Sequence, residues 1–128
     1  MFNEKYINLI MHLDELREYC INKKGVEEGF PFGGDTLVFK VMGKIFLLSG
    51  IDSQPVQFNA KCDPEKAIEL RENYPCVLPG YHMNKQHWNT IICDGFVSDK
   101  QIQEWIDDSY NLVASSLTKK LKSELENL

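Results

Sequence analysis

The segment from Gly80 to Thr90 contains the side chains of this sequence that best suit contact with a ligand. It holds two aromatic residues, two histidines, one lysine and two asparagines, and it has no carboxylate. Aromatic rings can stack on nucleic-acid bases, while lysine and amide groups bind phosphates and base edges. The segment is therefore predicted to form a contact surface, and nucleic acid is one ligand that it suits.

The same side chains also have a structural interpretation. Tyr81 and Trp88 can pack in or beside the core, with the indole N–H bonded to a carbonyl. Asn84 and Asn89 can tie down loops through hydrogen bonds to the backbone. We expect packing for Trp88, and for the two asparagines both interpretations stay open.

Neither a metal site nor a catalytic group is expected in this segment. His82 and His87 are five positions apart, whereas two ligands on one helix face are four apart, and the segment has no carboxylate. The chain has no G-x-x-x-x-G-K phosphate loop and no G-x-S-x-G elbow. A thiol of Cys62 or Cys93 beside one of the histidines is the remaining catalytic alternative. We expect a protein without enzymatic activity and without a cofactor.

The composition is that of one folded domain, with 128 residues, 43% hydrophobic and 26% charged. No apolar run is long enough to cross a bilayer, and the first residues do not resemble a signal peptide. We therefore expect a cytoplasmic monomer with no membrane partner. Four cysteines without a C-x-x-C pair are predicted to be reduced and mostly buried. A net charge of −5 disfavours general binding to polyanions but is compatible with a local basic face.

Three helices are predicted to support the contact segment. Apolar residues at three- and four-residue steps indicate a first amphipathic helix over residues 3–22. A second begins at the Asp63 cap, which a proline follows, and ends near residue 73. A third begins at the Ser98 cap. The tail from Thr118 either extends this last helix or frays.

Alternation of apolar and polar residues predicts a meander of three antiparallel strands followed by two short strands, at residues 35–41, 44–49, 54–61, 76–78 and 88–93. The meander is predicted to have one dry and one wet face, with Lys40, Lys44 and Lys61 on or beside the wet face. The order of the elements predicts an α+β fold, a single two-layer domain over residues 1–128. Its sheet is mainly antiparallel and twisted, and its helices pack on one side.

A short loop is predicted before the first strand. Pro31 holds Phe30 in an extended conformation, and the glycines that follow permit a sharp turn. We expect the rings of Phe30 and Phe32 to close one end of the core.

Several motifs together resemble the MmcQ/YjbR family of small bacterial proteins over about residues 16–121. The motifs are Leu16–Cys20, Phe30–Gly33, Asp35–Val41, Lys61–Glu65, Pro79–Lys85, His87–Thr90 and Ser109–Val113. The resemblance implies a CyaY-like fold. The family is described as predicted DNA-binding proteins with a double-wing arrangement, so DNA is the partner that the resemblance implies.

We therefore hypothesise a non-catalytic protein that contacts the nucleic-acid backbone through sheet-face lysines and the segment Tyr81–Thr90. The candidate contact residues are Lys40, Lys44, Lys61, Tyr81, His82, Asn84, Lys85, His87, Trp88 and Asn89. The alternative is a protein-interaction or adaptor module that does not bind nucleic acid. Its contact surface would be the exposed sheet face or the loop Phe30–Phe32, and its partner would be another protein.

Overall fold

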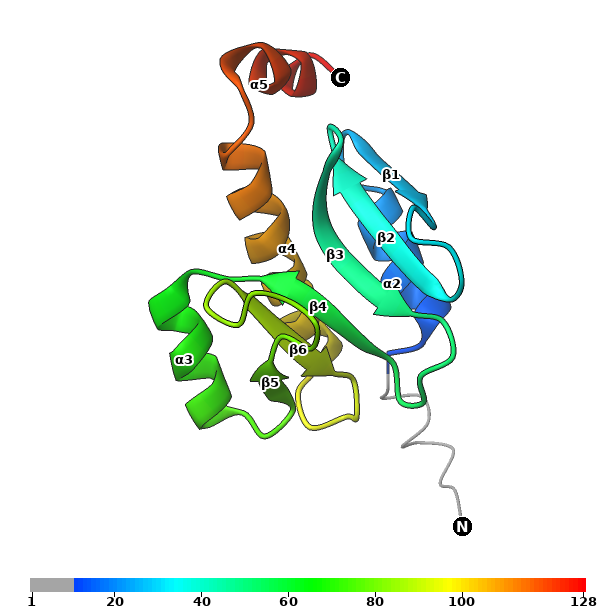
Figure 1. The fold of residues 1–128 in the computed structure, drawn as a ribbon, viewed down its shortest axis with the longest axis vertical. Coiled ribbons are helices and arrows are strands. Elements are labelled where there is room, and N and C mark those ends of the chain that lie inside the picture. The colour runs from blue at the N-terminus through cyan, green and yellow to red at the C-terminus, as the bar shows by residue number, and fades with distance from the viewer. Residues whose placement is uncertain (1–10) are drawn as a thin grey trace.

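The computed structural model describes residues 11–128, which form a six-stranded sheet with helices packed against one face (Figure 1). The strands are β1 (Val26–Gly29), β2 (Thr36–Val41), β3 (Lys44–Gly50), β4 (Gln57–Lys61), β5 (Val77–Pro79) and β6 (Trp88–Ile92). Their order across the sheet is β1-β2-β3-β4-β6-β5, and every neighbouring pair is antiparallel. The predicted α+β fold is therefore confirmed.

Four helices are described: α2 (Leu13–Ile21), α3 (Pro64–Asn73), α4 (Asp99–Ser115) and α5 (Lys119–Glu126). Side chains cap three of them, because Asp63, Ser98 and Thr118 each accept a hydrogen bond from the backbone N–H three residues later. The first eight residues of the helix predicted over residues 3–22 lie outside the described part of the chain. The tail that was predicted to extend the last helix or fray forms a separate helix, α5.

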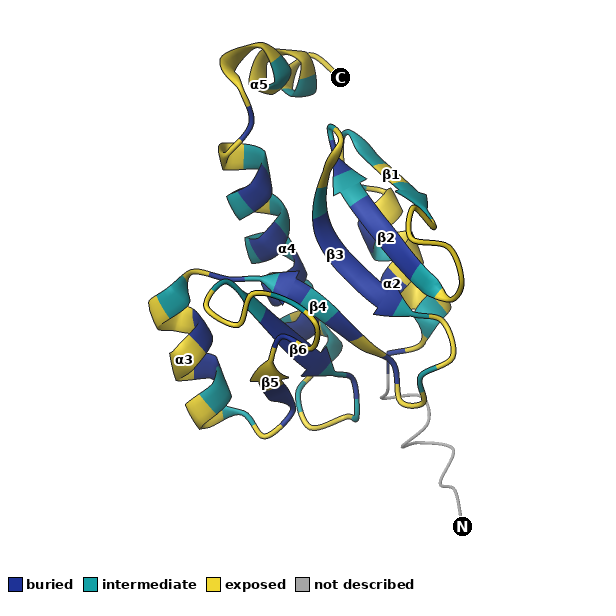
Figure 2. Cartoon of the chain, in the orientation of Figure 1, coloured by how far each residue is buried: buried dark blue, intermediate teal, exposed yellow. Residues whose placement is uncertain are grey.

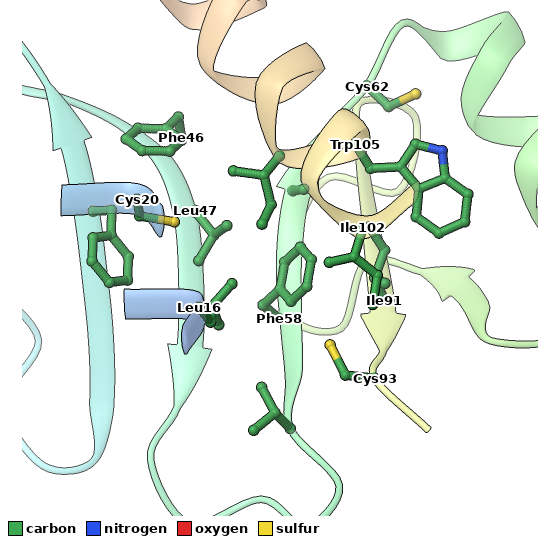
Figure 3. Close-up of a cluster of buried hydrophobic side chains, with 14 of the residues drawn as sticks. Leu16, Cys20, Phe46, Leu47, Phe58, Cys62, Ile91, Cys93, Ile102 and Trp105 are labelled. Atoms are coloured by element: carbon green, nitrogen blue, oxygen red, sulfur yellow. The ribbon is translucent and has the colours of Figure 1, made fainter. Parts of the chain in front are cut away.

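The core lies between the inner face of the sheet and helices α2 and α4. Ile102 and Trp105 of α4 lie against Phe58 of β4 and Ile91 of β6, and all four side chains are buried (Figure 3). Burying a side chain of this size contributes about 1.5–3 kcal/mol. The outer surfaces of α3 and α5 are exposed (Figure 2). The helices thus cover one face of the sheet and leave the other open.

Strand β1 was not predicted, and it changes the role of the loop that follows it. β1 pairs with β2 at the edge of the sheet, so residues 30–35 become a hairpin loop. The rings of Phe30 and Phe32 are 47% and 66% exposed, so the prediction that they close the core is wrong. Gly33 and Gly34 have φ of 72° and 60°, the left-handed region that glycine adopts without strain.

A β-bulge reverses the alternation of side chains in β3. Phe39 pairs with Leu47 and Lys40 with Ile45, so Phe46 is an additional residue between them. Both Phe46 and Leu47 are buried in the core, and the residues on the other side of the bulge change faces. Ile45 therefore faces outward with Lys40, and the preceding residue in β3 turns to the side of the helices.

A buried serine fixes α4 to the sheet beside this bulge. The hydroxyl of Ser109 donates to the carbonyl of Phe46 and accepts from the N–H of Lys61 at 2.8 Å. The side chain thereby joins β3 and β4 on the inner face. All four cysteines are free and buried, as predicted. In residues 11–128 no helix has the length and hydropathy needed to cross a bilayer.

Candidate functional site

A groove lies on the face of the sheet that the helices leave uncovered. Side chains alternate along each strand, so outward residues form rows across the sheet. The row through its middle holds Val38, Leu48, Asn59 and Thr90. The loops before β2, between β3 and β4, and between β5 and β6 also line the groove, whose volume is about 580 Å³. Val38 and Leu48 are buried on this face, so it is less wet than predicted.

Both main-chain polar groups of Tyr81 are hydrogen-bonded to side chains of the outward row, Thr90 and Asn59. Its N–H donates to the hydroxyl of Thr90 at 2.9 Å, and the amide of Asn59 donates to its carbonyl at 3.1 Å. The hydroxyl of Thr90 in turn donates to the side-chain carbonyl of Asn59. These bonds hold the β5–β6 loop over the sheet and fix the main chain of Tyr81 at the rim of the groove.

Gly80 allows this loop to pass close to β6. Its N–H donates to the carbonyl of Trp88 at 2.9 Å. A Cβ atom at this position would lie 2.8 Å from that oxygen and 2.9 Å from the Cβ atom of Trp88. Only a residue without a side chain fits without displacing β6, so Gly80 is required by packing.

Aromatic rings stand on two rims of the groove. Tyr81 is 69% exposed, and its ring centroid lies 4.0 Å from that of His82 with the planes inclined by 47°. His82 has φ of 58°, and this left-handed turn places the two rings side by side. Phe32 lines the groove from the loop before β2. The groove therefore offers exposed π-faces to a ligand.

The predicted lysines do not share one face. Lys40 and Lys61 belong to outward rows, paired with Ile45 and Trp88 respectively. Lys44 pairs with the buried Val41 and turns to the side of the helices, where its ammonium donates to the carbonyl of Ser116 at 3.3 Å. The prediction that Lys44 lies with the other two is therefore wrong, because the bulge in β3 reverses the alternation.

The two asparagines have structural roles. Asn89 is 1% exposed on the inner face, and its amide donates to the carbonyl of Ala67 in α3 at 3.3 Å. It cannot reach a ligand on the open face, so its prediction as a contact residue is wrong. Asn84 is exposed, but its side chain accepts from the N–H of Gln86 at 2.9 Å and so shapes the loop.

The remaining predicted residues lie at the edges of this loop. Lys85 is exposed, and its ammonium donates to the carbonyl of Gly80 at 3.3 Å. His87 is half-buried, and its carbonyl accepts from the N–H of Cys62 at 2.8 Å. Trp88 is half-buried on the outer face beside Lys61. Within the described residues its indole N–H has no hydrogen-bond partner, so the predicted bond to a carbonyl is absent.

Of the residues that line the groove, only Tyr81 and His82 were predicted as contact residues, and those missed include Phe32, Asp35, Asp52 and Asn59. Asn59 follows the outward alternation of β4, and that signal could have identified it. Phe32 was assigned to the core because aromatic residues beside a proline are commonly buried. Asp35 and Asp52 lie in two loops far apart in the sequence, and only the pairing of β2 with β3 brings those loops together.

Formal charge differs between the two ends of the groove. Asp35 precedes β2 and Asp52 follows β3, at the end where Thr36 pairs with Gly50. At the opposite end lie Lys40, across from Ile45, and Lys61, at the end of β4. The groove lining itself contains the two aspartates and neither lysine nor arginine. Of the two ends of the groove, an anionic ligand would therefore be attracted to the one beside Lys40 and Lys61.

The cysteine thiols lie in surroundings that keep them protonated. Burial raises the pKa of Cys93 to about 12, and it also raises the pKa of Cys62. A thiol must become a thiolate to act as a nucleophile. The environment of both sulfur atoms opposes the catalytic alternative. In residues 11–128 no group of three or more histidine, cysteine, aspartate or glutamate side chains could hold a metal ion.

Comparisons with known proteins agree with one another. The family model described as YjbR matches residues 21–112. The chain is 43% identical over 96 residues to the uncharacterised protein YbdF of Escherichia coli O157:H7. The aligned region covers 74% of this chain and 78% of YbdF. It is 31% identical over 119 residues to the uncharacterised protein YjbR of Escherichia coli K12, covering 92% of this chain and all of that protein. The crystal structure of the Deinococcus radiodurans protein DR2400, with the family-model domain DUF419, superposes with a TM-score of 0.85 at 38% identity, covering 91% of this chain and 89% of that one.

Proposed function

The chain belongs to the YjbR family, and from the geometry of its open sheet face we propose that it binds single-stranded nucleic acid without catalysing a reaction. The observation that carries the proposal is the position of Tyr81. Its main chain is fixed by two strands, while its ring stands exposed at the rim of a groove with His82 beside it. A ring held in this way is a stacking platform for an unpaired base.

Other groups on the same face support binding of a strand. Asn59 and Gln57 line the groove, and amides can bond to the edges of unpaired bases. Lys40 and Lys61 face outward at one end, where they can contact phosphates. Stacking requires bases that are free of a duplex, and the two lysines beside the groove are too few to track a double helix on a chain of net charge −5. Single strands are therefore the favoured form.

A binding role without catalysis agrees with the chemistry of the face. The two serines that line the groove, Ser49 and Ser53, donate their hydroxyls to backbone carbonyls and not to His82. The cysteine thiols lie in the core with raised pKa values, as described above for Cys93. Retention of a ligand by stacking and hydrogen bonds needs no reactive group.

One observation favours a second candidate, a protein-interaction module. Asp35 and Asp52 lie at one end of the groove, close to the exposed ring of Phe32. A peptide with a basic residue and an apolar residue would match this end better than a phosphate would. The two candidates therefore differ in the sign of charge that the groove attracts.

The proposal is tested by fluorescence anisotropy with labelled single-stranded and double-stranded DNA and single-stranded RNA of matched length. We expect single strands to bind more tightly than the duplex, because stacking on Tyr81 requires unpaired bases. A Kd weaker than about 100 μM at low salt, the poor end of non-specific binding, contradicts the proposal. Preferential binding of a basic peptide would support the second candidate.

A further inference from the structure

Lysines from three separate segments gather at the end of the fold where α5 lies. Leu125 of α5 packs beside Gly25 and Met42, and a Cβ atom on Gly25 would lie 2.7 Å from the Cδ1 atom of Leu125. The ammonium of Lys44 lies 3.3 Å from the carbonyl of Ser116, just before α5. Figure 1 shows α5 beyond the turn between β2 and β3. These contacts place residues 24–27, 40–44 and 116–126 together.

The three segments form a positive region on an acidic protein, which we call the lysine end. The six lysines of the lysine end are Lys24, Lys40, Lys44, Lys119, Lys120 and Lys122. The same segments contain three glutamates, whereas the whole chain has a net charge of −5. Across residues 11–128 the ion pairs involve other cations, Arg17, Lys23 and Lys66, and none of the six lysines forms one. Lys40 lies across from Glu27 in the pairing of β1 with β2, so the other five lysines carry most of the excess positive charge.

The lysines of α5 do not stabilise the helix that carries them. Three of the first four residues of α5 are lysines: Lys119, Lys120 and Lys122. The first turn contains no acidic residue. Positive charge is unfavourable there because the helix dipole has its positive end at the N-terminus. The apolar side of α5, with Leu121 and Leu125, is half-buried against the body of the protein. Its lysines therefore remain exposed to solvent and repel one another.

The lysine end adjoins the groove. Lys40 pairs with Ile45, and Ile45 is one of the residues that line the groove. This is the end opposite Asp35 and Asp52, so a strand leaving the groove here avoids the two carboxylates. Lys40 faces outward beside the groove, and Lys44, at the other end of the β2–β3 turn, contacts the residue Ser116 that precedes α5.

We propose that the lysine end extends the nucleic-acid site, so that α5 binds the phosphates of a single strand whose bases lie in the groove. The inference rests on the proposed function, because the groove supplies the stacking and the lysine end supplies most of the charge. The inference assigns phosphate binding to α5. This helix lies outside the family match over residues 21–112 and does not line the groove. A strand longer than the groove should gain affinity from the additional contacts.

The test compares oligothymidylates of about 5 and about 15 nucleotides, which span the usual site sizes of single-stranded binding folds. The full chain is titrated beside a Lys119→Gln, Lys120→Gln, Lys122→Gln variant. Glutamine keeps the helix propensity of lysine, and thermal unfolding shows whether the variant folds. A matched pair of single variants adds a control: Lys120→Gln in α5 and Lys100→Gln in α4. Both lysines are exposed and occupy the second residue of their helices.

We expect the triple variant to lose at least 10-fold in affinity for the longer strand and to bind the shorter one as the native chain does. The salt slope for the longer strand should fall by about 2 units, because each phosphate contact on a single strand contributes about 0.7. Lys120→Gln should weaken binding of the longer strand, and Lys100→Gln should not. An unchanged affinity and slope of the triple variant for the longer strand overturns the inference.

The results also separate this inference from the proposed function. If the longer strand binds through the α5 lysines but Tyr81→Ala has no effect on it, the lysine end is correct and the groove proposal is wrong. If the native chain binds the shorter strand and the triple variant binds each strand as tightly as the native chain does, the groove stands and the lysine end is wrong. Vesicles of phosphatidylcholine and phosphatidylserine provide the competing polyanion. Loss of vesicle binding in the triple variant, with DNA binding intact, assigns the lysines to a membrane surface and overturns the inference.

Discussion

The hydroxyl of Thr90 in β6 donates to the side-chain carbonyl of Asn59 in β4, and together these two side chains hold the main chain of Tyr81. Both residues face outward from neighbouring strands in register. The position of the Tyr81 main chain is thus set by the sheet and does not depend on the loop alone. Fixed supports of this kind are what a binding site on a loop requires.

Replacing Thr90 with valine tests this support. The change keeps the shape but removes a donor to Asn59 and an acceptor for the N–H of Tyr81. We expect the free energy of unfolding to fall by about 1–3 kcal/mol, since two partners lose their bonds. Urea unfolding measures it. Thr36→Val, on the same face, is the control and should change stability much less. Equal stability of the two variants would show that the hydroxyl does not hold the loop.

Gly80→Ala tests the close approach of the loop to β6. The new Cβ atom would lie 2.8 Å from the carbonyl oxygen of Trp88, a backbone atom that cannot move aside alone. We expect a loss of about 1–3 kcal/mol in unfolding free energy, as for other overpacking changes. Gly29→Ala is the matched control, because a Cβ atom there meets nothing within 4 Å. If both variants unfold at the same urea concentration, the backbone contact is not rigid.

The elements that depend on local chemistry could be predicted from the sequence. The Asp63 and Ser98 caps predicted the starts of two helices, and the alternation in residues 54–61 predicted β4. These signals act within a few residues, so no tertiary information is needed. The fold class followed from the order of the elements.

The positions of side chains that depend on strand pairing could not be predicted in this way. Lys44 was placed on the wrong face because the extra residue Phe46 in the bulge shifts the alternation. Phe32 was assigned to the core because nothing in its own segment indicates that β1 precedes it as an edge strand. Asn89 looks like a surface residue in the sequence, and only its pairing with Ala60 on the inner face shows that it is buried. Register and bulges arise from contacts between distant segments.

A half-buried carboxylate at the start of α4 gives a prediction about pH. The Oδ1 atom of Asp99 is buried without a hydrogen bond in the described part of the chain. Burial raises the pKa of Asp99, the charge of Glu15 raises it further, and His12 opposes the shift. Because the folded state holds this proton more tightly than the unfolded state, stability is lost as pH rises from about 4 through the folded pKa.

The Asp99→Asn variant should not lose stability in this way as pH rises. We expect the variant and the native chain to have equal stability near pH 3 and the variant to be more stable at pH 7. Urea unfolding across this range measures the difference. Asp14→Asn, at the exposed start of α2, should instead lose about 0.3–1 kcal/mol at pH 7, because Asp14 favours the helix dipole. A difference that does not change with pH would show that the charge of Asp99 does not affect folding.

Replacing both Asp35 and Asp52 with asparagine distinguishes the two candidate functions. Two charges about 10 Å apart in water interact by about 0.4 kcal/mol, a factor of about 2 in affinity for each aspartate. If the groove binds nucleic acid, the double variant should bind single strands about 4-fold more tightly. A groove that binds a basic peptide would bind it more weakly after the same change. Glu72→Gln, exposed on α3, is the control and should change neither affinity.

The most direct test of the central claim is the affinity of the Tyr81→Ala variant for a short single strand, measured by anisotropy beside Phe96→Ala. Both rings are largely exposed, at 69% and 59%, but Phe96 does not line the groove. Loss of a stacking ring costs about 1–3 kcal/mol, so we predict at least a 5-fold weaker Kd for Tyr81→Ala and no change for Phe96→Ala. Equal affinities of the two variants and the native chain would contradict the assignment of the open face as a nucleic-acid site.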